Sequence, residues 1–128
     1  MSIHKGAGIL GLLLMASAAS LSAHHTVADL FDTKTHVTLR GTLTGVEWRN
    51  PHVFLHLATR GGDGSTVAWT VETLNQQGLS RAGLNLDAFK VGEALSMTVC
   101  VKKDGSRWAV TDTIDRPGGA ALVRVGGC

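Results

Sequence analysis

The chain has 128 residues, with 12 basic and 10 acidic side chains and a formal net charge of +2. This near balance argues against the strongly basic surface typical of nucleic-acid-binding proteins, so we expect no nucleic-acid partner. Three Trp, three Phe and no Tyr make up the aromatic residues, too few for an extended base-stacking platform.

The first 23 residues have the pattern of a cleaved secretory signal. Lys5 precedes an apolar run from Ala7 to Leu14, and small residues follow up to Ala23. The apolar run is too short for a transmembrane helix, which needs about 20 residues. We therefore expect a periplasmic or secreted protein with no membrane span in its mature form. Removal of Lys5 with the signal leaves 105 residues, 11 of them basic and 10 acidic, enough for one small domain.

The mature part divides into three segments. Residues 24–35 show little periodicity and are expected to form an N-terminal arm. Residues 36–117 carry the alternation and turn signals of a β-rich domain, and residues 118–128 are expected to form a C-terminal tail.

The first predicted strand runs from Val37 towards Trp48, because apolar and polar residues alternate there. Gly41 and Gly45 interrupt the alternation, which predicts a bulge or strong coiling. Asn50-Pro51 ends the strand in a turn.

Two further strands and a helix follow. The second strand is predicted over 52–59 and the third over 66–73, with a hairpin turn at 61–64 between them. Residues 75–82 lose the alternation and are predicted to form a short helix, capped by its first residue and stopped by Gly83.

Two more strands complete the pattern, over 95–101 and 108–114, joined by a turn at Asp104-Gly105. Residues 121–125 could add a short edge pairing. Three strands, a helix and two strands match the OB-fold, so we predict an all-β domain with one short helix and a five-stranded OB-like barrel. A β-sandwich is the main alternative but usually has about seven strands.

Several motifs resemble a family of small exported bacterial proteins catalogued only as a domain of unknown function. They are the Ala-His-His start, the stretch Thr-Leu-Arg-Gly-Thr-Leu-Thr-Gly-Val-Glu-Trp-Arg-Asn-Pro-His-Val at 38–53, and Phe-Lys-Val-Gly-Glu at 89–93. The resemblance covers essentially the whole mature chain and implies an exported single β-rich domain without an assigned activity. The chain departs from the family pattern at Thr26, where Ser is usual, and at Cys128, where no cysteine is expected.

Two histidines beside the expected cleavage site are candidate metal ligands. Cleavage after Ala23 makes His24 the first residue, so its amine and imidazole can chelate one ion while another imidazole completes a T-shaped three-nitrogen set. Cleavage after Ser22 places His25 third from a free amine, in a square-planar set with two backbone amides. Such nitrogen sites select Cu(II) or Ni(II), which indicates copper binding at His24 and His25. The alternative is that both are only solvated residues of the arm.

His52 is the predicted third donor, because it follows Asn50-Pro51 at the barrel rim, where OB-folds bind ligands. His52 and His56 share a face, but four strand residues span about 13 Å, so the two cannot bind one ion together. In the alternative interpretation, His52 only hydrogen-bonds the Asn-Pro turn. His36, just before the first strand, is expected to be exposed to solvent.

The side chains around this turn form a predicted ligand-binding rim. Glu47 could accept a hydrogen bond from a ligating imidazole, or pair with Arg49 or Arg40 at the surface. Trp48 is either an exposed platform or, after a bulge, part of the core, and we prefer the core. The predicted rim comprises Glu47, Trp48, Asn50, Phe54 and His56.

Cys100 and Cys128 would enter an oxidising compartment on export. They could form a disulfide that ties the tail to a strand, or remain as a buried Cys100 and a free terminal thiol. Sequence alone leaves both open, since bridging needs Cα atoms within about 7 Å.

The sequence carries no nucleophile elbow, Cys-x-x-Cys pair or phosphate-binding loop, so binding is favoured over catalysis. Our leading hypothesis is a periplasmic copper-binding protein. The alternative is a metal-free OB-like module that binds a small ligand or an envelope protein at its rim. A third, enzymatic hypothesis is oxygen activation at a copper site that begins with His24.

Overall fold

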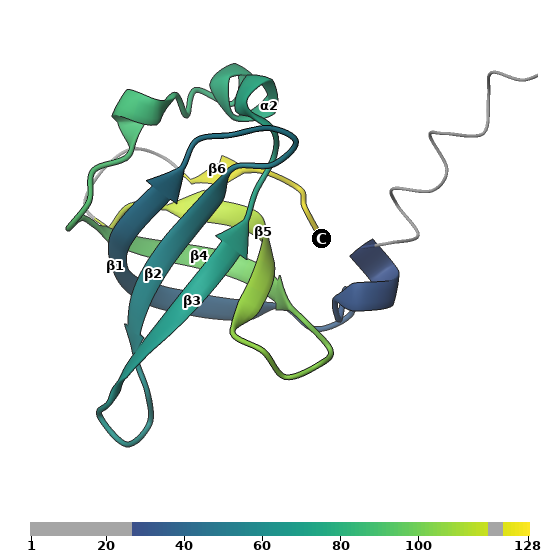
Figure 1. Ribbon diagram of the computed structural model, residues 1–128, viewed down its shortest axis with the longest axis vertical. Helices are drawn as coiled ribbons and strands as arrows, with labels where there is room; N and C mark the ends of the chain where they lie inside the picture. Colours follow the sequence, from purple (N-terminus) through teal and green to yellow (C-terminus); the bar gives the residue numbers. More distant parts are fainter. Residues whose placement is uncertain (1–26, 118–121) are drawn as a thin grey trace, which may run out of the picture.

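The structure is a computed structural model that describes residues 27–117 and 122–128. Figure 1 shows a small barrel with short helical segments at its end and side. Its elements are β1 (Val37–Glu47), β2 (Phe54–Arg60), β3 (Thr66–Glu72), α2 (Gln76–Arg81), the 3-10 helix η1 (Leu86–Ala88), β4 (Ala94–Val101), β5 (Trp108–Asp115) and β6 (Val123–Arg124).

Five strand pairings close the barrel. β1 pairs antiparallel with both β2 and β4, β2 pairs with β3, and β4 pairs with β5. A parallel pairing between β3 and β5 completes the ring in the order β1-β2-β3-β5-β4. This five-stranded barrel, with a helix between its third and fourth strands, confirms the OB-like fold predicted from the sequence.

Strand β1 is shared between two neighbours, and its glycines make this possible. Its first half pairs with β4, its second half pairs with β2, and the halves overlap at Gly41 and Thr42. A Cβ atom on Gly41 would lie only 2.5 Å from the carbonyl oxygen of Ala58, so glycine permits the close approach of β2. A register shift between Leu43 and Gly45 marks the predicted irregularity.

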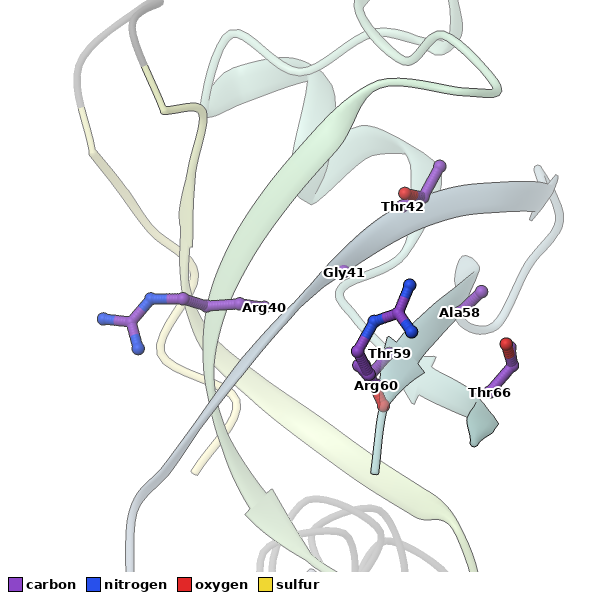
Figure 2. A pocket seen from close by; sticks show the side chains of 7 residues that line it. All are labelled: Arg40, Gly41, Thr42, Ala58, Thr59, Arg60 and Thr66. Carbon is purple, nitrogen blue, oxygen red and sulfur yellow. The ribbon is translucent and has the colours of Figure 1, made fainter. Parts of the chain in front are cut away.

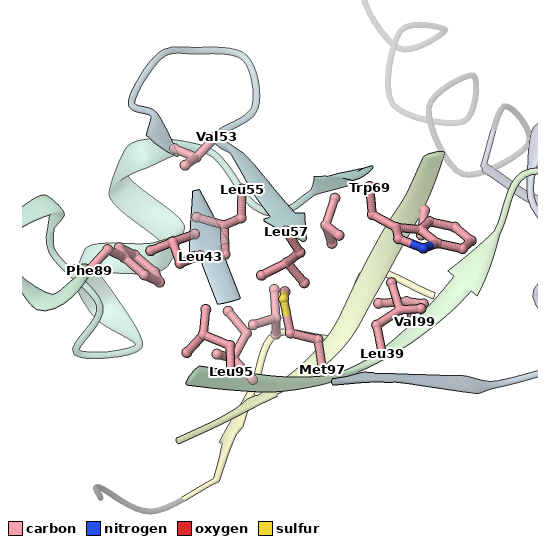
Figure 3. Close-up of a cluster of buried hydrophobic side chains, with 14 of the residues drawn as sticks. Leu39, Leu43, Val53, Leu55, Leu57, Trp69, Phe89, Leu95, Met97 and Val99 are labelled. Atoms are coloured by element: carbon pink, nitrogen blue, oxygen red, sulfur yellow. The ribbon is translucent and has the colours of Figure 1, made fainter. Parts of the chain in front are cut away.

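The barrel interior is filled by the apolar residues of alternating strand positions. In β2, Leu55 and Leu57 are fully buried while Phe54 and His56 lie on the other face. Figure 3 shows that these leucines meet side chains from the other strands. The interior of the barrel is formed by Leu39, Leu43, Leu55, Leu57, Trp69, Val71, Leu95, Met97, Val99 and Ile114.

Helix α2 and the segment after it close one end of the barrel with Leu79, Leu84 and Phe89, all of which belong to the same core. The helix begins as predicted, because the Asn75 side chain accepts a 2.7 Å hydrogen bond from the backbone N–H of Gly78. Gly83 follows the helix with φ of +82°, a conformation that favours glycine.

The second strand starts later than predicted. β2 begins at Phe54, and His52 lies in the loop before it. The reason is local: residues 48–51 turn towards α2, where the Asn50 carboxamide accepts a hydrogen bond from the backbone N–H of Gln76 at 3.2 Å. His52 is therefore placed by a loop and not by strand alternation.

The segments on both sides of the predicted domain pack against the barrel. Within the predicted arm, residues 27–30 form a helical turn, and Phe31 makes a β-bridge with Lys102. Val27 and Phe31 are four residues apart, so they lie on one helical face, and both contact a small apolar cluster on the outside of the barrel. Figure 1 shows this helical turn beside β5.

The tail contributes β6, which pairs antiparallel with β5 as the predicted edge pairing requires. Backbone hydrogen bonds then continue beyond β6, from Val125 and Gly126 to the carbonyl of Asp112 and from Gly127 to the carbonyl of Thr111. Within residues 27–117 and 122–128, no helix is both long enough and apolar enough to cross a bilayer.

Candidate functional site on the outer face of the barrel

His56 lies on the outer face of β2 and β3, His52 lies in the loop just before β2, and each of these histidines contacts a carboxylate. Strand pairing sets Phe54 opposite Glu72 and His56 opposite Thr70. On the other side of β2, Glu47 lies opposite Phe54. Because these residues occupy equivalent positions across three strands, their side chains share one face of the sheet.

His52 contacts Glu72. Its ring nitrogen Nδ1 meets Glu72 Oε1, and the side chain of His52 is 46% exposed while that of Glu72 is only 18% exposed. Glu72 therefore fixes the ring through Nδ1. The second ring nitrogen, Nε2, is then the one that could bind a ligand, since the imidazole is accessible to solvent. The sequence suggested Glu47 as the carboxylate partner of a ligating imidazole; for His52 that partner is Glu72.

Glu47 instead serves His56. The Glu47 Oε1 atom lies 2.8 Å from His56 Nε2, and Thr70 Oγ1 lies 3.4 Å from His56 Nδ1. The other carboxylate oxygen of Glu47 lies 2.9 Å from the guanidinium of Arg49. Because both ring nitrogens of His56 have partners, this imidazole is much less suited than His52 to bind a metal ion.

Two aromatic rings lie next to the histidines, and cationic side chains cover them. The rings of Phe54 and Trp108 meet edge to face, with centroids 5.9 Å apart and an interplanar angle of 77°. The Arg49 guanidinium lies 4.9 Å from the Phe54 centroid, and Lys102 Nζ lies 4.8 Å from the Trp108 centroid. The rings thus form a cation-capped pair on this face.

The two remaining predicted rim residues hold the loop in place. Trp48 is half-buried against the main core, as preferred from the sequence, so it is not an exposed platform. Its carbonyl oxygen accepts a 2.8 Å hydrogen bond from Gln76 Nε2. Asn50 is exposed and hydrogen-bonds Gln76 as well. Both residues therefore fasten the His52 loop to α2.

The predicted metal ligands His24 and His25 lie outside the described residues. The described chain begins at Val27, which packs against the outer apolar cluster of Phe31, Cys100 and Val110. Val110 lies directly opposite Glu72 in the parallel β3–β5 pairing. The cluster that anchors Val27 is thus one strand away from the carboxylate that holds His52.

Cys100 and Cys128 are joined in a disulfide, with Cα atoms 5.9 Å apart. Cys100 is fully buried, and Cys128 packs against the same outer cluster. Among the described residues, one group of three or more His, Cys, Asp or Glu side chains has all its ligand atoms within 4.8 Å of one another. It comprises the two cysteines and the exposed His36.

A groove of about 320 Å³ lies between the middle of β1 and the end of β2, away from the His52 loop. It is lined by Arg40, Gly41, Thr42, Ala58, Thr59, Arg60 and Thr66. Figure 2 shows that the Arg40 side chain points away from the other lining residues, so the two guanidiniums do not converge on one ligand. The groove contains none of the predicted rim residues.

Sequence reasoning missed Glu72, Thr70 and Trp108. Glu72 and Thr70 could have been predicted, because alternation in the third strand places them on the face opposite Trp69 and Val71. Trp108 reaches Phe54 through the parallel pairing of β3 with β5, which the local pattern of neither strand reveals.

Residues 12–111 match the family of unknown function DUF6152. The chain belongs to this family. The resemblance to a family of unknown function, inferred from the sequence motifs, is therefore confirmed. The matched range contains His24, His25, His52 and Glu72, whereas Cys128 lies beyond its end.

No curated protein matches the chain significantly. One similar solved structure is the mitochondrial single-stranded DNA binding protein Rim1 from S. cerevisiae, at 13% sequence identity and a TM-score of 0.47. The alignment covers 72% of this chain and 97% of that chain. At this level of similarity we transfer no ligand from Rim1 to the DUF6152 chain.

Proposed function

We propose that the chain is exported to the periplasm or secreted, loses its signal segment, and binds Cu(II) through its new N-terminus. In this proposal His24 and His25 supply the first nitrogen donors and His52 supplies a further one. The observation that carries it is the contact between His52 Nδ1 and the mostly buried Glu72. A metal-binding histidine usually donates its second ring N–H to such a carboxylate, which fixes the ring and raises its basicity.

The reach of the chain supports the proposal. Val27 packs on the cluster that contains Val110, and Val110 lies opposite Glu72 on the adjacent strand. Neighbouring strands are about 4.8 Å apart. His25 is two positions before Val27, with only Thr26 between them, so their Cα atoms lie within about 7 Å of each other. In this proposal, chain connectivity keeps His25 within reach of Val27, which is compatible with a site shared with His52.

The chemistry of the donors supports copper over harder ions. A terminal amine and imidazole nitrogens are the ligands that Cu(II) prefers in tetragonal geometry. All of them must be unprotonated to bind, so copper affinity should fall as the pH is lowered. With His24 as the first residue, its amine and imidazole occupy two positions, and His52 Nε2 supplies the third.

The first test determines the mature N-terminus by intact mass and then titrates the processed protein with Cu(II). We expect a visible d–d band that saturates at one equivalent and is lost in the His24→Ala, His25→Ala double variant. A mature chain that begins at or before Ser20, no copper uptake at neutral pH, or an undiminished band in the double variant would each overturn the proposal.

Matched carboxylate variants test the role of His52. Glu72→Gln should lower Cu(II) affinity about 10- to 100-fold, the usual cost of losing a hydrogen bond to a ligating imidazole. His52→Ala should lower it at least as much. Glu47→Gln is the control, because it removes the equivalent contact from His56. Equal affinities for the two carboxylate variants would show that His52 is not a donor.

The alternative is a metal-free module that binds a small ligand or an envelope protein at the same face. It is favoured by the exposed Arg49 guanidinium over the Phe54 ring and by the exposed His52 side chain, on the strands and loop with which OB-folds usually bind. Under this alternative, His52→Ala leaves copper uptake unchanged but weakens capture of the partner by the immobilised protein.

A further inference from the structure

We propose a second, redox-gated metal site formed by His36, Cys100 and Cys128, separate from the proposed copper site. With the disulfide reduced, the two sulfurs and the His36 imidazole would bind a thiophilic ion, and Zn(II) fits the set best. The three ligand atoms already lie within 4.8 Å of one another. The inference does not depend on the N-terminal histidines.

Strand pairing explains why the imidazole lies beside the sulfurs. Val37 pairs with Val99 at the start of β1. Continuing this antiparallel register by one residue sets His36 opposite Cys100, on the same outer face of the sheet. His36 is exposed and Cys100 is fully buried within the outer cluster, so the group of three ligand atoms runs from the surface of the barrel into that cluster.

The tail keeps Cys128 in place without the covalent bond. Gly126 and Gly127 hydrogen-bond the carbonyls of Asp112 and Thr111 at 3.0 and 2.9 Å. A Cβ atom on Gly127 would lie 2.4 Å from the carbonyl oxygen of Thr111, so glycine allows the tail to approach β5 this closely. Cys128 Sγ itself lies 3.5 Å from the carbonyl oxygen of Val110. The two sulfurs therefore remain neighbours after reduction.

The donor set matches zinc chemistry. Zn(II) accepts two thiolates and one imidazole in tetrahedral geometry, with a water in the fourth position. With Zn–S bonds of about 2.3 Å, two thiolates of a tetrahedral site lie about 3.8 Å apart. The sulfurs must therefore separate modestly from their bonded position, which rotation of the two cysteine side chains about their Cα–Cβ bonds can provide. Solvent reaches the open position past the exposed His36.

The reaction balances with a dithiol as reductant. The dithiol donates two electrons and two protons to the Cys100–Cys128 bond and leaves as its own cyclic disulfide. Zn(II) then displaces the two thiol protons as it forms two Zn–S bonds and one Zn–N bond. Disulfide and metal ion are therefore alternative states of one site, and each ion bound releases two protons.

Co(II) is the probe, because thiolate-to-cobalt charge transfer reports sulfur ligation directly. Mature protein is reduced with a dithiol under anaerobic conditions, freed of the reductant and titrated with Co(II), and Zn(II) is then added as competitor. We expect a near-ultraviolet charge-transfer band at one equivalent, two protons released per ion, and displacement of cobalt by zinc. The unreduced protein should show no such band.

Variants separate a folded three-donor site from thiols that bind metal in an unfolded chain. Cys128→Ser should abolish the band, and His36→Ala should weaken Co(II) binding by about tenfold or more because one of three protein donors is lost. His56→Ala is the matched histidine control and should leave binding unchanged. No band in the reduced protein, or equal affinities for His36→Ala and the unsubstituted protein, would overturn the inference. Neither result would bear on Cu(II) binding by the oxidised protein.

Discussion

The two faces of the sheet formed by β1, β2 and β3 differ in chemistry although they share the same strands. The inner face presents Leu43, Leu55 and Leu57, all fully buried. The outer face presents His56 and Glu47 as a partly exposed pair, with His56 Nε2 2.8 Å from Glu47 Oε1. Alternation along the strands therefore separates stability from function. The inner residues stabilise the barrel, and the outer residues can contact ligands.

The two faces predict a large difference in the loss of stability between alanine substitutions at neighbouring positions of β2. Leu57→Ala should destabilise the protein by about 2–5 kcal/mol, because it removes buried methyl groups and leaves a cavity in the core. His56→Ala should change stability by no more than about 1 kcal/mol, since it removes a side chain of the outer face and its contact with Glu47. Urea unfolding of the two variants measures both effects. Similar losses would contradict the assignment of stability to the inner face.

Alanine substitutions at two glycines of β1 should also differ in their effect on stability, by a smaller amount. Gly41→Ala should cost about 1–3 kcal/mol, because its new Cβ would lie 2.5 Å from the Ala58 carbonyl and push β2 away. At Gly45 the nearest atom to a new Cβ is His56 Cδ2 at 3.5 Å, an ordinary contact. Gly45→Ala should therefore stay within about 1 kcal/mol of the unsubstituted protein. Thermal unfolding of both variants provides the measurement.

If both glycine variants unfold at the same temperature as the unsubstituted protein, the close approach of β1 and β2 is not what requires glycine at position 41. If both are equally destabilised, the cost arises from the bulge that follows and not from contact with Ala58. The pair thus separates two reasons for glycine in β1, the close approach of β2 at Gly41 and the register shift between Leu43 and Gly45.

Most of the fold was predictable because local signals determine it. Alternation located five strands, glycine-rich turns separated them, and Asn75 marked the start of α2. Even the pairing of Glu72 with Phe54 follows from the hairpin, since counting outward from Arg60 opposite Thr66 leads to that pair. Extending this register to the start of the hairpin places Glu72 beside the loop of His52, a partner in β3 that local motifs do not reveal.

The features of the fold and of the site that the sequence did not predict depend on contacts between distant parts of the chain. Trp108 reaches Phe54 because β3 and β5 pair in parallel, and Val27 docks near Val110 because an apolar cluster forms outside the barrel. The disulfide requires β6 and the following tail to lie along β5. None of these contacts leaves a periodic signal in either segment, so spacing and composition cannot reveal them.

The smallest predicted effect lies at the hairpin between β2 and β3, where the outer face ends in solvent. Asp63 Oδ1 accepts hydrogen bonds from the Ser65 hydroxyl at 2.6 Å and from the Ser65 N–H at 2.9 Å. The hydroxyl is the larger cause, and together they hold the pKa of Asp63 below its ordinary value. Because the folded-state pKa is depressed, the stabilising contribution is present above the ordinary pKa and is lost as the pH falls through the folded-state value.

Ser65→Ala should therefore raise the Asp63 pKa towards its ordinary value, which an NMR titration of the carboxyl carbon would detect. The turn between β4 and β5 supplies the internal control, because there the Ser106 hydroxyl and N–H lower the pKa of Asp104 in the same way. Ser65→Ala should leave the Asp104 titration unchanged, since each turn satisfies its own carboxylate locally. A shift at both carboxyls would instead mean that the two hairpins are coupled through the barrel wall, and the outer face would then be less independent of the core than its alternation implies.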